Sequence, residues 1–229
     1  MFKKFFLFPF YLLFGFILFA DTPDDVVKKI QWFGQSAFKI ETPKAVVFID
    51  PVGVKTPEKA DIILVTHSHG DHFSKSDIEK LSKPDTIIIA PFDIDGKNKI
   101  LLPNNKMDVK GLVIEAVPAY NIVKADRHPK EKNFAGYILT VNGVRVYHAG
   151  DTEKIPEMKN FNVDIALLPL GQKYTMNSVS EAVEAAVDLK AKIAIPMHFG
   201  QYEGTEVDAK KFVDELTGKR IKALILKRN

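Results

Sequence analysis

Short apolar runs alternate with polar segments along the chain, and the length of each run indicates the element it forms. Runs of about four to eight residues rich in Val, Ile and Phe are typical of buried strands. They predict strands at residues 26–32, 37–40, 45–49, 62–65, 86–90 and 112–117 in the first half of the chain. Further strands are expected at residues 135–141, 144–149, 164–169, 193–197 and 221–226, whereas residues 91–111 consist of short turn-rich pieces.

Apolar positions three and four residues apart predict helices between these strands. One helix signal begins at Ser74, and two others cover residues 178–189 and 208–216. Asn142-Gly143 is a strong hairpin dipeptide between two of the expected strands. Two β-rich halves, each closed by helices, favour an α/β (α+β) fold in which two sheets pack face to face with helices outside.

The N-terminal segment, residues 1–20, has a different pattern. Lys3 and Lys4 form a basic start, and an apolar stretch rich in Phe follows before the chain becomes polar. This layout predicts a secretory signal peptide and export to the periplasm. Leu18 stands where a small residue is preferred for cleavage, so an uncleaved N-terminal membrane anchor is the alternative. We therefore expect one domain to comprise residues 21–229.

Composition narrows the class of protein further. The chain has 229 residues, of which 46% are hydrophobic, and this is enough to bury one core. The formal charge of +3 falls to +1 when Lys3 and Lys4 are removed with the leader. A body so close to neutral gives no electrostatic reason to expect nucleic-acid binding, and we expect a small-molecule substrate instead. The chain has no cysteine, so it forms no disulfide and offers no thiolate to a metal.

The most informative polar segment directly follows the apolar run at residues 62–65. It places His67, His69, Asp71 and His72 on one short turn, and so holds three of the six histidines of the chain. Neutral imidazoles and carboxylates are ligands that Zn²⁺ prefers. The segment therefore predicts a metal site, in which Asp71 acts as a ligand, as the acceptor that orients the attacking water, or as both.

Two later strands also end in potential metal ligands. Gly150-Asp151-Thr152 follows one of them and His198 follows the other. With the motifs in this order, the chain resembles the metallo-β-lactamase superfamily over residues 26–229. The resemblance implies a four-layer αββα sandwich in which Asp151 bridges two metal ions and His198 completes the second site.

Within that superfamily, the chain resembles the small metal-dependent hydrolases of the group that contains ascorbate-phosphate lactonase. The segments that carry this likeness are Pro118-Ala119-Tyr120, Gly150-Asp151-Thr152 and Pro196-Met197-His198. It implies one or two Zn²⁺ ions, or else Mn²⁺ or Fe²⁺, and a metal-bound hydroxide that attacks an ester, lactone or phosphoester. The alternative is a non-catalytic periplasmic protein that binds a metal or ligand on a degenerate hydrolase scaffold.

One position departs from the family pattern. Asn121 stands where the family places a third histidine of the first metal site, the one built from His67 and His69. Because Asn is a poor zinc ligand, this site is expected to be weak or vacant. His128 is the only spare histidine nearby, and it could supply the missing ligand, contact the substrate or be a solvated loop residue.

Two residues beside the motifs are candidates for supporting roles. A ligand histidine needs its second ring nitrogen held by a carboxylate or carbonyl. Asp50, at the end of an expected strand, is the candidate for this role, and an ordinary turn residue is the alternative reading. His148 lies on a strand three residues before Asp151, which favours a supporting or core role over metal ligation.

The loop at residues 120–134 bears on the substrate. It carries the strongest basic run of the chain, Lys124, Arg127, His128, Lys130 and Lys132. Such a run could attract an anionic substrate, or it could simply be solvated. Tyr174, on a strand-to-helix loop of the expected active face, either donates a hydrogen bond to a developing oxyanion or packs against its neighbours.

Overall fold

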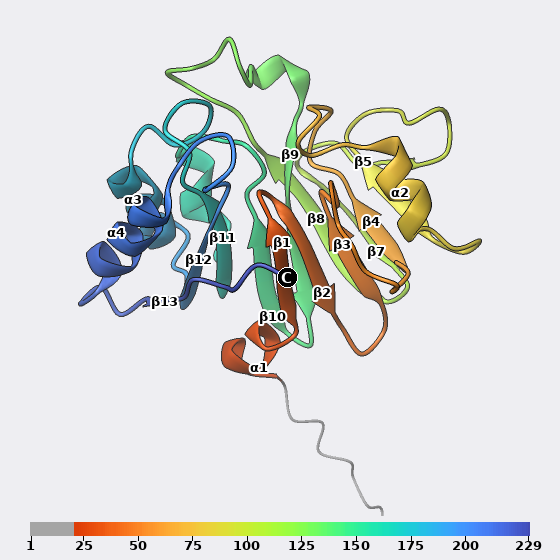
Figure 1. Ribbon diagram of the computed structural model, residues 1–229, viewed down its shortest axis with the longest axis horizontal. Helices are drawn as coiled ribbons and strands as arrows, with labels where there is room; N and C mark the ends of the chain where they lie inside the picture. Colours follow the sequence, from red (N-terminus) through yellow and green to blue (C-terminus); the bar gives the residue numbers. More distant parts are fainter. Residues whose placement is uncertain (1–20) are drawn as a thin grey trace, which may run out of the picture.

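The computed structural model describes residues 21–229, so the predicted signal peptide lies outside the described residues. Two β-sheets face each other, and helices lie on their outer sides (Figure 1). This arrangement confirms the predicted αββα sandwich. None of the helices within residues 21–229 has both the length and the apolar composition needed to cross a bilayer.

The first sheet follows the order of the chain. Its six strands are β1 (Ile30–Gly34), β2 (Ala37–Glu41), β3 (Val46–Ile49), β4 (Ile62–Leu64), β5 (Ile87–Ala90) and β6 (Lys99–Ile100). The first three strands pair antiparallel, and β3 to β6 pair parallel. Strand β4 is completely buried, as its unbroken apolar sequence predicts, because both of its faces are covered.

The second sheet has seven strands in the order β13-β12-β11-β10-β9-β8-β7. They are β7 (Asn105–Val109), β8 (Leu112–Pro118), β9 (Ala135–Val141), β10 (Val144–His148), β11 (Ile165–Pro169), β12 (Ile193–Met197) and β13 (Lys222–Ala223). Strands β7 to β10 pair antiparallel and β10 to β13 pair parallel. The predicted Asn142-Gly143 hairpin joins β9 to β10, with both turn residues at positive φ.

Two apolar layers hold the sandwich together. The larger one lies between the sheets and extends under α3 (Val179–Asp188) and α4 (Glu206–Leu216). The smaller one lies between the outer face of the first sheet and α2 (Lys75–Leu81). Short 3-10 turns occupy η1 (Lys130–Lys132) and η2 (Pro156–Asn160).

Three elements differ from the sequence prediction. The strand expected over residues 26–32 begins only at Ile30, because α1 (Pro23–Val27) precedes it. A capping box between Thr22 and Asp25 starts this helix, and local hydrogen bonds there prevail over the apolar run. The turn-rich residues 91–111 contain β6 and β7, and the last strand is shorter than the expected 221–226.

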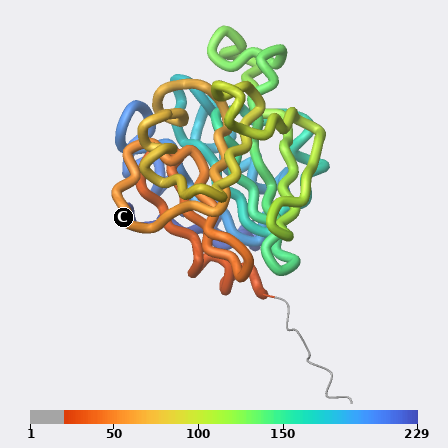
Figure 2. The backbone as a smooth tube through the Cα atoms, turned by 90° about the vertical axis from the view of Figure 1, so that its right-hand side faces the viewer, coloured from red at the N-terminus to blue at the C-terminus, as the bar shows by residue number. Residues whose placement is uncertain are grey.

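The candidate ligands gather at one edge of the sandwich because three strands end there. The first motif follows β4, Asp151 follows β10, and His198 follows β12. The segment between β8 and β9, drawn in green, rises above the rest of the chain at the top of Figure 1 and Figure 2, at the end opposite α1. This segment carries Asn121 and His128, so one side of the site depends on a loop.

Candidate metal centre

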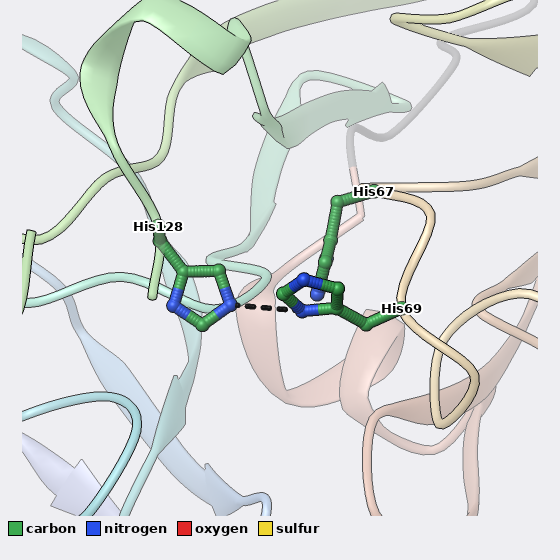
Figure 3. Close-up of side chains that lie close together, drawn as sticks. All are labelled: His67, His69 and His128. Carbon is green, nitrogen blue, oxygen red and sulfur yellow. Dashed lines mark hydrogen bonds between the residues drawn. The ribbon is translucent and has the colours of Figure 1, made fainter. Parts of the chain in front are cut away.

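The first group of candidate ligands consists of His67, His69 and His128. One ring nitrogen of each residue lies within 4.8 Å of the others. His128 Nε2 is 3.3 Å from His69 Nδ1, and Figure 3 shows these two rings pointing toward each other beside His67. Because His128 is only 2% exposed, its interpretation as a solvated loop residue is wrong.

The second group consists of Asp71, His72, Asp151 and His198, whose ligand atoms also lie within 4.8 Å of one another. Asp71 Oδ2 is 3.4 Å from His72 Nε2 and 3.4 Å from His198 Nε2. Both imidazole rings therefore turn their Nε2 atom toward the same carboxylate oxygen. Two histidines and two carboxylates form a donor set suited to Zn²⁺, Mn²⁺ or Fe²⁺.

Asp151 joins the two groups through its separate oxygens. Its Oδ1 lies 3.1 Å from His72 Nε2 and 3.2 Å from His198 Nε2. Its Oδ2 lies 3.9 Å from His67 Nε2 and 3.6 Å from His128 Nε2. Asp151 therefore turns one carboxylate oxygen toward each of the two groups and could contribute a ligand atom to a metal at either.

The donor atoms also fit bound metal on grounds of hydrogen bonding. Within residues 21–229, four of these atoms are buried without a hydrogen-bond partner: His67 Nε2, His72 Nε2, His198 Nε2 and Asp151 Oδ1. Buried polar atoms normally find partners, and leaving four unsatisfied in one place would be costly. A cation at the second group would satisfy His72 Nε2, His198 Nε2 and Asp151 Oδ1, and a cation at the first group would satisfy His67 Nε2.

The charges of these groups differ between the two sides. Burial lowers the pKa of His67 and His128, so both rings stay neutral. Burial alone would lower the pKa of His72 and His198 as well, but Asp151 outweighs it and both values are raised. Burial alone would raise the pKa of Asp151, but His198 and His72 hold it well below its ordinary value. A metal that binds at the second side therefore has to displace protons from His72 and His198.

Two carboxylates hold the far nitrogens of the second group. Asp50 Oδ2 lies 2.7 Å from His72 Nδ1, and both Asp50 oxygens accept hydrogen bonds from Thr66. Glu203 Oε1 lies 2.9 Å from His198 Nδ1. Each contact directs the opposite nitrogen, Nε2, toward the ligand group. The structure thus brings Asp50 to the position that a supporting carboxylate requires.

Glu203 also organises the loop that carries Tyr174. The sequence analysis did not predict this role of Glu203. Its Oε2 accepts from the Lys173 and Tyr174 backbone N–H groups over 2.9 and 2.6 Å. A Cβ at Gly171 would lie 1.7 Å from Glu203 Oε1, so only glycine allows this close approach. Nothing in the pattern around Glu203 marks it, because the residue lies in a loop after β12.

Asn121 does not join either ligand group. Its Nδ2 donates to the Tyr174 carbonyl over 2.7 Å and lies 3.2 Å from His128 Nδ1. Its Oδ1 accepts from the Glu153 backbone N–H over 3.0 Å. These backbone partners fix the orientation of the amide and turn it beside the His128 ring rather than toward the metal centre.

Glu153 is a second buried carboxylate that the sequence did not reveal. It accepts hydrogen bonds from the backbone N–H groups of Ile122, Val123 and Lys124 over 2.7, 2.7 and 2.9 Å. Burial alone would raise the pKa of Glu153, but these three donors keep it below its ordinary value. The only available signal was its position two residues after Asp151, where a strand end already held a functional carboxylate.

Gln35 is another contact that sequence reasoning missed. Its Nε2 donates to Asp71 Oδ2 over 3.0 Å, and its backbone carbonyl accepts from the His198 backbone N–H over 3.0 Å. Gln35 lies in the turn between β1 and β2 with a φ of 47°. A polar residue in a hairpin turn is too common to have marked this role.

His148 lies apart from both ligand groups. Its Nε2 is 2.9 Å from the Ser36 carbonyl oxygen, and its Nδ1 accepts from the Gly150 backbone N–H over 3.2 Å. The ring is completely buried against Phe38. These contacts agree with the expected supporting or core role.

A cavity of about 450 Å³ opens over the ligand groups. It is lined by His69, Asp71, Arg127, His128, Asp151, Tyr174 and Tyr202. The Arg127 guanidinium carbon lies 5.3 Å from the centre of the Tyr174 ring. The wall therefore combines two aromatic rings with a cation, while the floor carries the carboxylates and imidazoles.

Comparisons with known proteins agree with this geometry. A family model described as "Beta-lactamase superfamily domain" matches residues 29–198. A UPF0173 metal-dependent hydrolase of Thermococcus onnurineus is 32% identical over 219 residues, covering 87% of this chain and 96% of its own length. A UPF0173 metal-dependent hydrolase of Methanosphaera stadtmanae is 34% identical over 227 residues, covering 83% of this chain and 93% of its own.

Solved structures show the same fold. A protein of Parabacteroides distasonis, provisionally described as a metal-dependent hydrolase, is 38% identical with a TM-score of 0.78 and covers 86% of this chain and 93% of its own. A metallo hydrolase of Ignicoccus hospitalis is 21% identical with a TM-score of 0.72 and covers 87% of this chain and 95% of its own. The chain therefore belongs to the metallo-β-lactamase superfamily, among its metal-dependent hydrolases.

Proposed function

We propose that the protein is a hydrolase that holds two metal ions and cleaves an ester, lactone or phosphoester bond in a small anionic molecule. The main support for this proposal is the position of Asp151. One of its carboxylate oxygens faces His72 and His198, and the other faces His67 and His128. We propose Zn²⁺ as the metal, with Mn²⁺ and Fe²⁺ as alternatives. When bound, the metal pair supplies a water of lowered pKa and polarises the bond under attack.

Asp71 is suited to direct the attacking water. Its carboxylate lines the cavity, and Gln35 holds one of its oxygens through a 3.0 Å hydrogen bond. Burial alone would raise the pKa of Asp71, but His198 and His72 hold it below its ordinary value, so the group stays ionised. An ionised carboxylate beside the reacting atoms can orient a water molecule and accept its proton.

Arg127 and Tyr174 supply the argument for an anionic substrate. Both line the cavity above the ligand groups, and Arg127 Nε lies 3.6 Å from the carboxylate of the exposed Asp126, which does not line the cavity. A planar guanidinium can bind a carboxylate or phosphate on the substrate through two parallel hydrogen bonds. The Tyr174 hydroxyl is then a candidate donor to the oxyanion that develops at the bond under attack.

The test combines metal analysis with a substrate panel. We expect about two metal ions per chain, and hydrolysis of at least one member of a panel of phosphodiesters, esters and lactones. Asp71→Asn should abolish that hydrolysis, and Arg127→Gln should slow cleavage of the anionic members while sparing neutral analogues. Metal binding without hydrolysis of any member would favour a non-catalytic metal-binding protein instead.

We also propose that the protein is exported. The support is the sequence of residues 1–20, in which Lys3 and Lys4 precede a long apolar stretch. Cell fractionation should recover the protein in the periplasm, or in the membrane fraction if this segment is not cleaved. A cytosolic protein that retains residues 1–20 would contradict the proposal.

A further inference from the structure

The segment that carries His128 is folded around a single buried carboxylate. The side chain of Glu153 is 1% exposed. Its carboxylate accepts hydrogen bonds from the backbone N–H groups of three successive residues. Ile122 and Val123 donate to Oε2, each over 2.7 Å, and Lys124 donates to Oε1 over 2.9 Å. Both oxygens of the carboxylate are therefore used to shape the start of the loop.

The loop then closes on itself before it reaches His128. The Asn121 backbone N–H donates to the His128 carbonyl over 2.8 Å, and the Asn121 side chain reaches the Tyr174 carbonyl. Thr152 Oγ1 donates to the Tyr120 carbonyl over 2.8 Å and accepts from the Tyr120 N–H over 3.1 Å. Residues 120–128 are thus tied to the strand end that also bears Asp151.

Apolar packing contributes little to this part of the loop. Ile122 is 54% exposed and Val123 is 76% exposed. A loop held in this way depends on hydrogen bonds rather than on buried apolar area. Asp151 lies three residues beyond the end of β10, His198 lies one residue beyond the end of β12, and the first motif begins three residues beyond β4, whereas His128 lies ten residues beyond the end of β8 at Pro118.

We propose that Glu153 is the positioning residue for the first metal site, because it folds residues 122–124 into the turn that delivers His128 to His67 and His69. This inference rests on the proposed metal centre. It also explains how a chain with Asn121 at the expected ligand position still completes three histidines. His128 on the loop takes the place of the missing histidine at position 121, and Glu153 fixes the conformation of that loop.

The substitution Glu153→Gln tests this role with almost no change in size. The carboxylate accepts three N–H groups, but a side-chain amide has one oxygen and presents an NH₂ group on its other side. At least one of the three backbone N–H groups would then face the NH₂ group of the glutamine instead of an acceptor. We expect the turn at residues 122–124 to open as a result. We expect metal at the first site to bind about 10- to 100-fold more weakly, as for other losses of ligand support, while the second site keeps its metal.

The matched control is Glu157→Gln. Glu157 contacts the same loop, through the Tyr120 hydroxyl at 2.9 Å and Lys130 Nζ at 2.9 Å, but it does not touch residues 122–124. The control removes the same charge from the same region. We expect it to retain two metal ions with unchanged affinity.

Four full-length proteins are compared: wild type, Glu153→Gln, Glu153→Asp and Glu157→Gln. Zinc titration by calorimetry gives the stoichiometry and the affinity of each site, and the absorption spectrum of the cobalt-substituted protein reports the ligands of each ion. Hydrogen exchange of residues 121–132 reports the loop. Glu153→Asp keeps both oxygens on a shorter side chain, so its first-site affinity should lie between those of wild type and Glu153→Gln.

The outcomes separate this proposal from the proposed function. A wild-type protein that binds no metal would defeat the metal centre itself. A wild type with two ions and a Glu153→Gln variant with two equally tight ions would overturn the positioning role. Loss of both ions in Glu153→Gln, or an equal loss in Glu157→Gln, would also overturn it. If Glu153→Gln does not fold, wild-type affinity in Glu153→Asp decides against the proposal.

Discussion

The two sides of the metal centre are built by different parts of the fold. The second side takes Asp71, His72, Asp151 and His198 from segments that directly follow buried strands. The first side takes His67 from such a segment, but completes itself with His128 from a long loop. Packing of the strand in the core fixes the position of a ligand that follows it closely. A ligand on a long loop is fixed only if other contacts hold the loop.

Each side has a buried glutamate that shapes a neighbouring loop, and the comparison between them is informative. Glu203 contacts the His198 ring directly and receives the N–H groups of Lys173 and Tyr174. Glu153 receives three N–H groups of the other loop and does not contact a ligand ring. Asn121 joins the two loops through its bond to the Tyr174 carbonyl. The loop that carries His128 and the loop that carries Tyr174 are therefore joined by a hydrogen bond.

The largest effect is expected from Asp151→Ala, because Asp151 turns one carboxylate oxygen toward each of the two groups. Its removal takes one ligand from each proposed metal ion and removes the carboxylate that lies nearest to the Nε2 atoms of His72 and His198. Affinity at both sites should fall by more than about 100-fold, since even outer-shell losses cost 10- to 100-fold. Metal analysis after dialysis measures this, and Glu157→Gln, at a half-buried carboxylate outside both groups, is the control. A variant that retains one tightly bound ion would show that Asp151 does not bridge.

The strand-borne part of this site could be predicted from the sequence, whereas the loop-borne part was left open, with metal ligation one of three alternatives for His128. His67, His69, Asp151 and His198 were accessible because apolar runs mark where strands end, and parallel strands bring their ends to one edge. The fold followed from the same runs. The route of the loop that contains His128 is set by side chain-to-backbone hydrogen bonds between distant segments, which leave no periodic signal.

The same limit explains the supporting residues. Asp50 was predicted because it directly ends a strand beneath the motif, and its carboxylate lies 2.7 Å from His72 Nδ1. Glu153, Glu203 and Gln35 were not predicted, since each acts through backbone groups or across the fold. At α1, where Val26 was expected in a strand, a local capping box instead decided the structure.

The next largest effect separates the roles of His128 and Asn121. His128→Ala should remove the third ligand of the first side and weaken metal there by more than about 100-fold, leaving one ion per chain. Asn121→His should not raise occupancy. The new ring cannot both donate to the Tyr174 carbonyl and accept from the Glu153 N–H, as the amide does, so the loop should loosen.

Zinc titration of both variants checks this pair of expectations. Two equal and tight sites in His128→Ala would show that His128 is not a ligand. A gain of affinity in Asn121→His would show that residue 121 still faces the metal.

A smaller effect is expected from Glu203→Gln, which keeps the size of the side chain but removes its charge. Glu203 Oε1 lies 2.9 Å from His198 Nδ1, and a carboxylate there makes the opposite nitrogen a stronger donor to metal. The second site should lose about 10- to 100-fold in affinity, the range for outer-shell partners of metal ligands, while the first site is little changed. Site-resolved cobalt spectra measure this, and a first-site loss alone would reverse the assignment of the two glutamates.

The dependence of metal affinity on pH should also distinguish the two sides. In the metal-free protein, Asp151 raises the pKa of His72 and His198 in spite of burial, which favours the protonated form of both rings. Burial lowers the pKa of His67 and His128, so those rings bind metal without losing a proton. Metal at the second side must displace protons, and metal ligands must be deprotonated to bind.

It follows that acid should weaken the second site more than the first. Each displaced proton costs about tenfold in apparent affinity per unit of pH, and this cost applies as pH falls below the raised pKa values of His72 and His198. Zinc titrations between about pH 6 and 8, the range in which histidines titrate, measure the slope for each site. Calorimetry in buffers of different ionisation enthalpy counts the protons released. Equal slopes at both sites would mean that the two groups carry the same charge, and that the asymmetry of the metal centre is one of loop support alone.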